Sequence, residues 1–337
     1  MKFTARYFAA LVLFVFCVIG SAGVAGAADK VNALIISHCD RETSNIHKAS
    51  LAAKDFLEAT GKFKVDLFSN GALSASEADA LQQTADNEIQ LTQAPVYVVA
   101  NASGVTGFFV YDYPYFIERE EDYSKVAASD MADELAEQVR GKINVHLGRA
   151  WYNGPMTVAS VNRPINEPKD LAGFKMRSTT SSITVEYLTK LGASPVPMLT
   201  SEVYTALQQG TINGTYSALH VHTDFKYDEV CKYFYKDAST TPMLIPCFSN
   251  TYYQSLTADD QKLIDEALLI FSNTAKEEAA RMDAAAKQYL IDKGSAFVEP
   301  TEEHKVIMRA AGKEVRESKA DMAGQKYIDW TIKILGR

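Results

Sequence analysis

The stretch GFKMRSTTSS, residues 173–182, is the part of the chain around which we expect the fold to be organised. Phe174 and Met176 belong to a predicted strand that ends at Arg177, and a Ser/Thr cluster leads from there into a predicted helix at 182–191. A guanidinium presents a fixed fork of donors, and a helix N-terminus adds free N–H groups and a partial positive charge. Arg177 is therefore a candidate binding site for a small carboxylate.

Alternating strand and helix patterns predict an α/β fold, and the chain is too long for one compact core, so we expect two domains. The first three strands are separated by helical patterns, which favours a mostly parallel sheet. The predicted strands are 31–37, 63–68, 89–99, 143–151, 156–161, 174–177, 230–235 and 243–248.

Two further segments have distinctive patterns. A helical pattern runs from Thr257 to about Asp292, and at ~1.5 Å per residue it would exceed about 50 Å, enough to brace two domains. The aromatic-rich run 108–116 is interpreted as a buried strand beside a hinge, or alternatively as part of a ligand cleft.

The N-terminus has the pattern of a cleaved signal peptide at 1–28. Lys2 and Arg6 precede an apolar run at 11–19, and Ala25-Gly26-Ala27 fits a cleavage site. We therefore expect export to an oxidising compartment. There, Cys231 and Cys247 either form a disulfide or remain buried thiols, because their flanking segments are candidates for antiparallel pairing.

The net charge of −8 argues against nucleic acid and anionic membranes as partners, although it allows a local cation in a cleft. No dinucleotide, P-loop, zinc-protease or hydrolase motif is present in the sequence. His220 and Asp224 have a spacing that could chelate a metal, but a solvated helix face is the simpler interpretation. Cys39 lacks a clear base in the sequence around it. We therefore expect no cofactor, no metal and no catalytic residue.

Three spaced motifs resemble those of solute-binding proteins of tripartite ATP-independent periplasmic (TRAP) transporters, the DctP-type family. DLAGFKMR at 170–177 resembles the D-L-x-G-x-K-x-R segment of that family, and LGASPVPM at 191–198 resembles L-G-A-x-P-V-P-M. SEVYTALQQG at 201–210 resembles S-E-V-Y-x-A-L-Q-x-G, and the following Ile212-Asn213-Gly214 resembles V-D-G. The shared order makes the resemblance specific.

The resemblance implies a two-lobed, periplasmic-binding-protein-like fold (a Venus flytrap) with a long helix spanning both lobes. We expect 29–153 with 243–282 to form lobe I, and 154–242 with 283–337 to form lobe II. The implied protein is a periplasmic monomer and not an enzyme. It would capture an organic acid and deliver it to a membrane permease. The matching arginine binds the ligand carboxylate in the family, and here it is Arg177.

The chain departs from the family pattern around this arginine. An aromatic wall residue of the family is replaced by Thr200, and an asparagine that also binds the carboxylate is replaced by Ser217. Sialic-acid-binding members carry a second arginine near the position where this chain has Met156 and Thr157. These changes predict a ligand with one carboxylate and an apolar remainder, aromatic or branched.

Further contacts are expected from aromatic walls and from first-lobe loops around 37–40 and 94–97 that close over the ligand. Besides Arg177, the predicted ligand-binding residues are Ser217, Tyr216, Thr200, Thr157, Met156, Trp151, Tyr152, His38, Asp40, Tyr97, Tyr113 and Phe248. Two other functions stay open at this point: a periplasmic input protein for a membrane kinase, and an extracytoplasmic enzyme acting on small acids.

Overall fold

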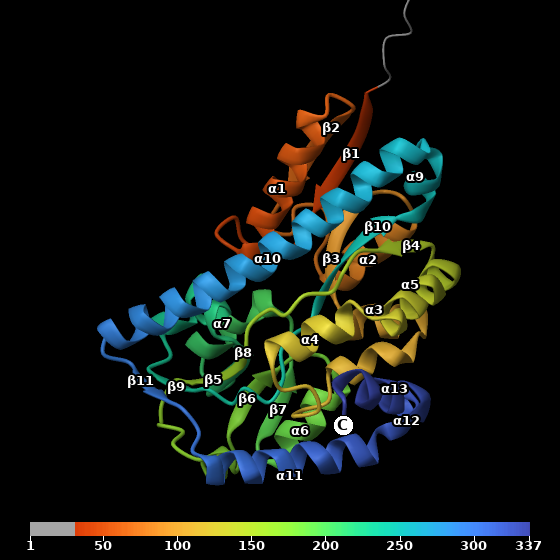
Figure 1. The fold of residues 1–337 in the computed structure, drawn as a ribbon. Helices are drawn as coiled ribbons and strands as arrows, with labels where there is room; N and C mark the ends of the chain where they lie inside the picture. Colours follow the sequence, from red (N-terminus) through yellow and green to blue (C-terminus); the bar gives the residue numbers. More distant parts are fainter. Residues whose placement is uncertain (1–30) are drawn as a thin grey trace, which may run out of the picture. The chain divides into compact units, whose positions relative to one another are not determined.

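The computed structural model of the chain describes residues 31–337, which form one compact unit. The predicted signal peptide lies outside the described residues. Two β-sheets, one of five strands and one of six, form the framework of this unit (Figure 1). We call the parts of the chain built on them the first lobe and the second lobe.

The first sheet is mostly parallel, as the sequence predicts. Its strand order is β2-β1-β3-β10-β4; β1 runs parallel to β2 and β3, whereas β10 runs antiparallel to β3 and β4. The strands are β1 (Asn32–Ser37), β2 (Phe63–Phe68), β3 (Leu91–Pro95), β4 (Val145–Leu147) and β10 (Leu244–Ser249). The helices of these segments are α1 (Asn45–Ala59), α2 (Glu77–Ala85), α3 (Val96–Ser103), α4 (Glu120–Ala127), α5 (Asp130–Ile143) and α9 (Asn250–Ser255).

The second sheet has the order β11-β9-β5-β8-β6-β7, with β6 parallel to both β7 and β8. Its strands are β5 (Met156–Ser160), β6 (Lys175–Ser178), β7 (Ser194–Pro197), β8 (Gly214–Ala218), β9 (Tyr233–Tyr235) and β11 (Ala296–Val298). The helices of these segments are α6 (Ser182–Lys190), α7 (Thr200–Gln208) and α8 (Leu219–Asp224), with short 3₁₀ turns η2 (Pro168–Leu171) and η3 (Tyr227–Glu229).

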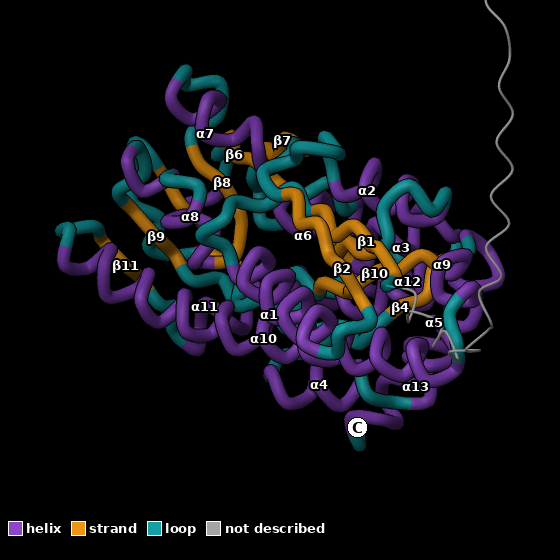
Figure 2. Tube along the Cα trace, turned by 90° about the horizontal axis from the view of Figure 1, so that it is seen from above, coloured by secondary structure: helices purple, strands orange, loops and turns teal. Residues whose placement is uncertain are grey.

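The predicted long helix is confirmed as α10 (Ala258–Asp292). Thr257 caps it, because the Thr257 side chain accepts a hydrogen bond of 3.2 Å from the backbone N–H of Asp260. The helix packs along α1 and against β10, and it also contacts α8 and β11 of the second lobe (Figures 1 and 2). One rigid element therefore braces both sheets.

The C-terminal helices contact both lobes. α11 (Glu302–Ser318) packs against α6, whereas α12 (Ala320–Ala323) packs against the 3₁₀ helix η1 (Thr106–Tyr111). α13 (Gln325–Leu335) then packs against α4. The residue boundaries of the lobes stay a prediction.

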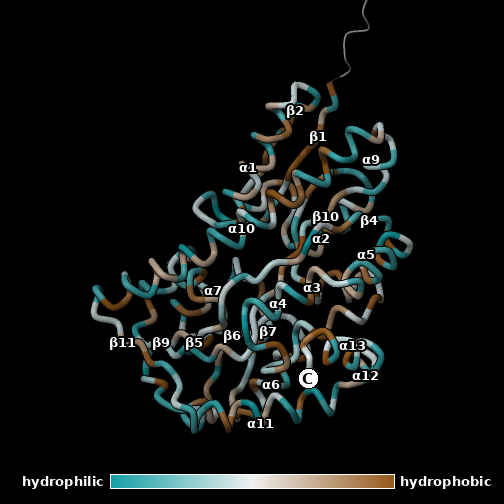
Figure 3. Tube along the Cα trace, viewed as in Figure 1, coloured by the Kyte–Doolittle hydropathy of each residue, from teal (hydrophilic) through white to brown (hydrophobic). Residues whose placement is uncertain are grey.

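Apolar residues of the first lobe face a shared core between its sheet, α1 and α10. Leu34 and Ile36 of β1 are buried there with Leu57 of α1 and Phe271 of α10, and Figure 3 shows much of β1 in the hydrophobic colour. None of the helices within residues 31–337 is both long enough and apolar enough to cross a bilayer.

Two predicted strands are wrong. The segment 96–99 opens helix α3, and the aromatic run 108–116 passes through η1 into turns, with Tyr115 at a φ of 56°. The aromatic rings are buried all the same, because a 3₁₀ turn packed by α12 and α13 covers them as well as a strand would. Side-chain apolarity alone could not distinguish these cases.

The disulfide alternative is also wrong: Cys231 and Cys247 are free and buried. Cys247 lies in β10 of the first sheet, whereas Cys231 precedes β9 of the second sheet. The expected antiparallel pairing of β9 with β10 does not occur, since β9 pairs with β5 and β11. The two thiols therefore belong to separate cores.

Candidate functional site

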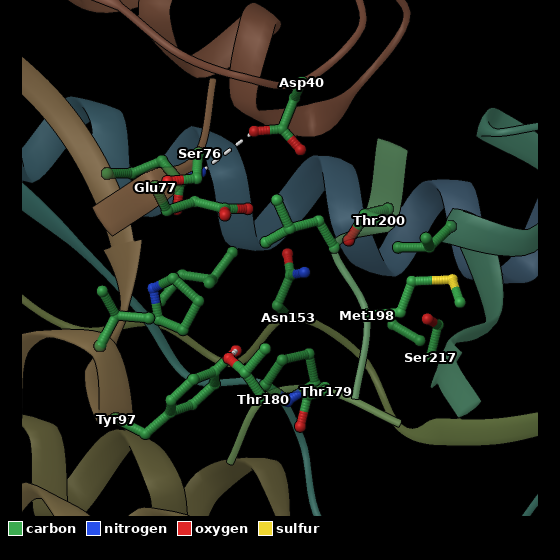
Figure 4. A pocket seen from close by; sticks show the side chains of 18 of the residues that line it. Asp40, Ser76, Glu77, Tyr97, Asn153, Thr179, Thr180, Met198, Thr200 and Ser217 are labelled. Carbon is green, nitrogen blue, oxygen red and sulfur yellow. Dashed lines mark hydrogen bonds between the residues drawn. The ribbon is translucent and has the colours of Figure 1, made fainter. Parts of the chain in front are cut away.

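A cavity of about 300 Å³ lies between the ends of strands from both sheets. The first lobe contributes the loop after β1, the start of α2, and residues of β3, α3 and β10. The second lobe contributes β5, β6, β8 and the start of α7, with Asn153 from the crossover between them. Figure 4 shows polar side chains from both lobes directed toward this space. The volume is at the lower end of the range for small-molecule sites, so the ligand is small.

Arg177 lies at the second-lobe side of this cavity and is only 6% exposed. Its Nε donates to Met198 O over 3.0 Å, and its Nη1 donates to Tyr216 O over 3.0 Å and to Ser217 Oγ over 2.9 Å. Its Nη2 donates to Thr200 Oγ1 over a longer distance of 3.3 Å. A guanidinium has five N–H donors, so one donor on Nη2 remains for a ligand.

Strand pairing explains why three separate motifs meet at this arginine. Arg177 of β6 pairs with Val196 of β7 on one side and with Thr215 of β8 on the other. Gly214 makes this arrangement fit, because a Cβ there would lie 2.4 Å from Ala159 O and 2.6 Å from the Phe174 ring. The parallel strands thus bring the ends of the three motifs to one edge of the sheet.

The first-lobe side of the cavity is acidic. Asp40 follows β1, and Gln93 of β3 donates a hydrogen bond of 3.0 Å from Nε2 to Asp40 Oδ2. Ser76 and Glu77 line the same side from the N-terminus of α2 (Figure 4). Burial raises the pKa of Asp40 to about 7, and the nearby charges of Glu77 and Asp224 add to the shift.

Six of the predicted ligand-binding residues line the cavity. They come from both lobes, and the first-lobe pair belongs to the two loops that were expected to close over a ligand. The six are Arg177, Ser217, Thr200, Met156, Asp40 and Tyr97.

The structure places the other seven elsewhere, so their predicted place on the cavity wall is corrected. Tyr216 contributes its backbone carbonyl to Arg177, but its hydroxyl donates to buried Asp237 on the other side of the sheet. Thr157 is fully buried next to Ser217 in the strand ladder.

The remaining five are held by core contacts. Trp151 packs on Phe271, and Phe248 packs on Tyr252 and Tyr253. The Tyr113 hydroxyl donates to Lys319 O over 2.7 Å. His38 Nε2 lies 3.1 Å from His47 Nδ1, and Tyr152 packs on Tyr123 beside a separate cavity. Aromatic type signals burial equally in a core and on a cavity wall, so the sequence did not separate them.

Sequence reasoning missed Gln93, Asn153 and Met198. Gln93 had a usable signal, because it is a polar residue within an apolar run of strand length. Asn153 is 5% exposed, and its Oδ1 accepts a hydrogen bond of 2.8 Å from Asn45 Nδ2 of α1. Its place in the crossover segment gave no indication of this contact.

Direct contacts join the lobes around the cavity. Thr180 Oγ1 lies 3.4 Å from the Tyr97 hydroxyl, and Ser181 Oγ donates to buried Asp112 over 2.7 Å. Thr43 donates to Asp224 at the end of α8. Loops of one lobe are therefore already held against the other.

The two chemical alternatives have structural explanations. His220 Nδ1 lies 2.8 Å from Asp283 Oδ1, and burial lowers the pKa of His222 to about 3. Within 31–337, no cluster of three or more metal-ligating His, Cys, Asp or Glu side chains is found. Burial, followed by the charge of Glu77, raises the pKa of Cys39, which disfavours the thiolate that a nucleophile needs.

Comparison with known proteins agrees with this geometry. The model of the DctP family, "Bacterial extracellular solute-binding protein, family 7", matches residues 36–321. The chain belongs to this family. Its members are solute-binding receptors and not enzymes, so the resemblance described from the sequence motifs is confirmed.

Two relatives illustrate the match along the chain. A solute-binding protein of Roseobacter denitrificans is 27% identical over 287 residues, which cover 84% of this chain and 86% of the relative. The C4-dicarboxylate-binding periplasmic protein DctP of Rhodobacter capsulatus is 27% identical over 271 residues, 80% of each chain.

Solved structures show the same two-lobed fold. The sugar acid binding protein DctPAm of Advenella mimigardefordensis, in complex with galactonate, superposes with a TM-score of 0.85 at 20% identity, covering 90% of this DctP-family chain and 98% of that chain. A TRAP periplasmic solute binding protein of Shewanella oneidensis with bound succinate has a TM-score of 0.83 at 22% identity, covering 90% and 99%. The predicted fold class is confirmed.

Proposed function

We propose that this protein is the extracytoplasmic receptor of a TRAP transporter, and that it binds a small organic monocarboxylate through Arg177. The observation that carries the proposal is the state of Arg177. It is buried at the wall of a small cavity, held in place by three second-lobe segments, and keeps an N–H donor on Nη2. A preorganised guanidinium binds a carboxylate with charge-assisted hydrogen bonds.

The printed ligands of related proteins support an acid as the ligand class. They are C4-dicarboxylate, galactonate and succinate in the three cases named above. Each carries a carboxylate, and a carboxylate is what Arg177 is suited to bind.

The cavity wall supports one carboxylate and an apolar body. Arg177 supplies the cation among the lining side chains within 31–337, so a second carboxylate would have no matching arginine. Met156, Met198, Val221 and Leu244 provide apolar surface between the two polar ends. An aromatic or branched body would bury its area against these side chains.

Ligand capture follows from this arrangement. A carboxylate that enters the cavity pairs with Arg177 of the second lobe, and Asp40, Pro95 and Tyr97 of the first lobe close over it. Closure excludes water and strengthens the ion pair, because the local dielectric falls. Higher affinity for the closed state drives the closure.

Delivery completes the proposal. Removal of the predicted signal peptide at 1–28 would release the protein as a monomer in the periplasm, where relatives of the same family act. We propose that the closed form docks on a membrane permease and releases its ligand there. Lobe I would comprise 29–153 and 243–282, and lobe II 154–242 and 283–337.

A thermal-shift screen tests the proposed function. Small monocarboxylates with aromatic or branched bodies are compared with their neutral primary amides, which keep the shape but lose the charge. We expect several acids to raise the melting temperature while their amides leave it unchanged. Equal shifts with acid and amide, or no shift with any carboxylate, would contradict the proposal.

A further inference from the structure

The cavity has two polar ends of opposite charge, one on each lobe. The second-lobe end holds the Arg177 guanidinium. The first-lobe end holds Asp40 and Glu77, together with Gln93 and Ser76 (Figure 4). The proposed carboxylate uses only the first of these ends, so the opposite end needs its own explanation.

A buried acceptor at the acidic end is unused. Gln93 is 3% exposed and lines the cavity, and its amide N–H donates to Asp40. This bond orients the amide so that Oε1 is left as an acceptor, and Oε1 has no hydrogen-bond partner among the described residues. Buried polar atoms are normally paired, so an unpaired acceptor beside two carboxylates indicates a missing donor.

Charge balance decides what kind of donor fits. A bound carboxylate neutralises Arg177, and the side chains of Asp40 and Glu77 then face the closed cavity without a cation lining it. A ligand hydroxyl would supply a hydrogen but no charge. A second ligand carboxylate would add repulsion. A cationic nitrogen supplies both donors and the compensating charge.

We infer that the ligand is a zwitterion, with its carboxylate at Arg177 and a protonated amine or other cationic nitrogen at Asp40, Glu77 and Gln93. This inference rests on the proposed function and specifies its substrate class. Because the two ends belong to different lobes, one ligand forms both charged contacts only when the lobes close around it. A carboxylate without the cationic group would engage one lobe and favour closure less.

The acidic end also makes binding depend on pH. Burial, Glu77 of α2 and Asp224 of α8 raise the pKa of Asp40 to about 7, so much of this carboxyl is protonated near neutral pH. His38 beside it is neutral there, because burial and then His47 lower its pKa to about 4. A cationic ligand group favours ionised Asp40, so binding releases a proton and tightens as the pH rises from about 6 to about 8.

The test uses matched probes that differ at one end. Calorimetry compares γ-aminobutyrate, γ-hydroxybutyrate and succinate, and then δ-aminovalerate, δ-hydroxyvalerate and glutarate, alongside proteinogenic amino acids and their 2-hydroxy counterparts. The wild type, Asp40→Asn and Arg177→Ala are measured with each probe. Asp79→Asn serves as the control, because Asp79 lies in the first turn of α2 but does not line the cavity.

We expect the tightest binder to carry a cationic nitrogen and to exceed its hydroxyl counterpart by about tenfold or more. Asp40→Asn should abolish most of that preference and the pH dependence, while Asp79→Asn keeps both. If acids bind through Arg177 but the best of them lacks a cationic nitrogen, or Asp40→Asn keeps the preference, the zwitterion inference is overturned and the proposed function stands. If no acid binds, or binding survives Arg177→Ala, both fail.

Discussion

Arg177 of β6 donates a 2.9 Å hydrogen bond from Nη1 to Ser217 Oγ of β8, on top of its bonds to the Met198 and Tyr216 carbonyls. The proposed ligand anchor is therefore also a brace of the second sheet. We predict that Ser217→Ala lowers the free energy of unfolding by about 1 kcal/mol, because Arg177 loses a buried acceptor. Denaturant titration measures this, with exposed Ser201→Ala as the control. Equal stability of the two variants would show that the bond does not brace the sheet.

Tyr216 provides a separation of stability from binding. Its hydroxyl donates to buried Asp237, which also accepts a 2.9 Å bond from the Tyr187 hydroxyl and a bond from Ser239. We predict that Tyr216→Phe lowers the free energy of unfolding by about 1–3 kcal/mol, because Asp237 loses a donor. Its side chain does not line the cavity, so calorimetric affinity should change by less than about twofold. A large loss of affinity with normal stability would return the Tyr216 ring to the site.

Asp40 should make the protein less stable as the pH rises. The pKa of Asp40 increases from 3.8 to about 7 on folding, chiefly through burial, so the folded state holds the proton more tightly than the unfolded state. This carboxyl therefore contributes a destabilisation that grows between pH about 4 and about 7 and is complete above it. Asp40→Asn should raise the free energy of unfolding by about 2 kcal/mol near pH 8 and change it little near pH 4.

The measurement is unliganded chemical unfolding at both pH values. Asp112 is a built-in reference, since burial raises its pKa to about 7 as well and the variant retains it. A variant that is destabilised near pH 8 would contradict the assignment of Asp40 as an uncompensated buried carboxyl.

The cysteines should remain reduced in the exported protein. Cys39, Cys231 and Cys247 are free, and the last two lie in separate cores. We predict that thiol titration of the unfolded, signal-free protein finds all three, and that a reducing agent leaves the melting temperature unchanged. A melting temperature that falls on reduction would reveal a disulfide and contradict the strand arrangement.

Much of the fold was predictable because its signals are local. The long helix α10 has a cap at Thr257, helical spacing and a stop at Gly294, and each can be recognised without tertiary information. The run at 108–116 gave no such signal, because apolar residues at every position fit a strand and a packed 3₁₀ turn equally well. The disulfide question needed the strand order, which no local pattern near Cys231 or Cys247 contains.

The site was predictable where a motif fixes the geometry. Arg177, Thr200 and Ser217 meet because parallel strands align the ends of their motifs. The acidic end depends on packing between distant loops, which places Glu77 beside Asp40 and leaves Gln93 Oε1 unpaired. These relationships exist only in the folded chain, so the sequence pointed to Asp40 but not to its role.

Calorimetric titration of the best acid from the screen into Arg177→Ala tests the central claim most directly. The Arg149→Ala variant, which removes an exposed arginine outside this cavity, is the matched control. We predict that Arg177→Ala weakens binding by more than about 2 kcal/mol while Arg149→Ala binds like the wild type, because only Arg177 offers a preorganised fork to the carboxylate. An Arg177→Ala protein that is folded, as judged by circular dichroism, and binds the acid with wild-type affinity would contradict the account.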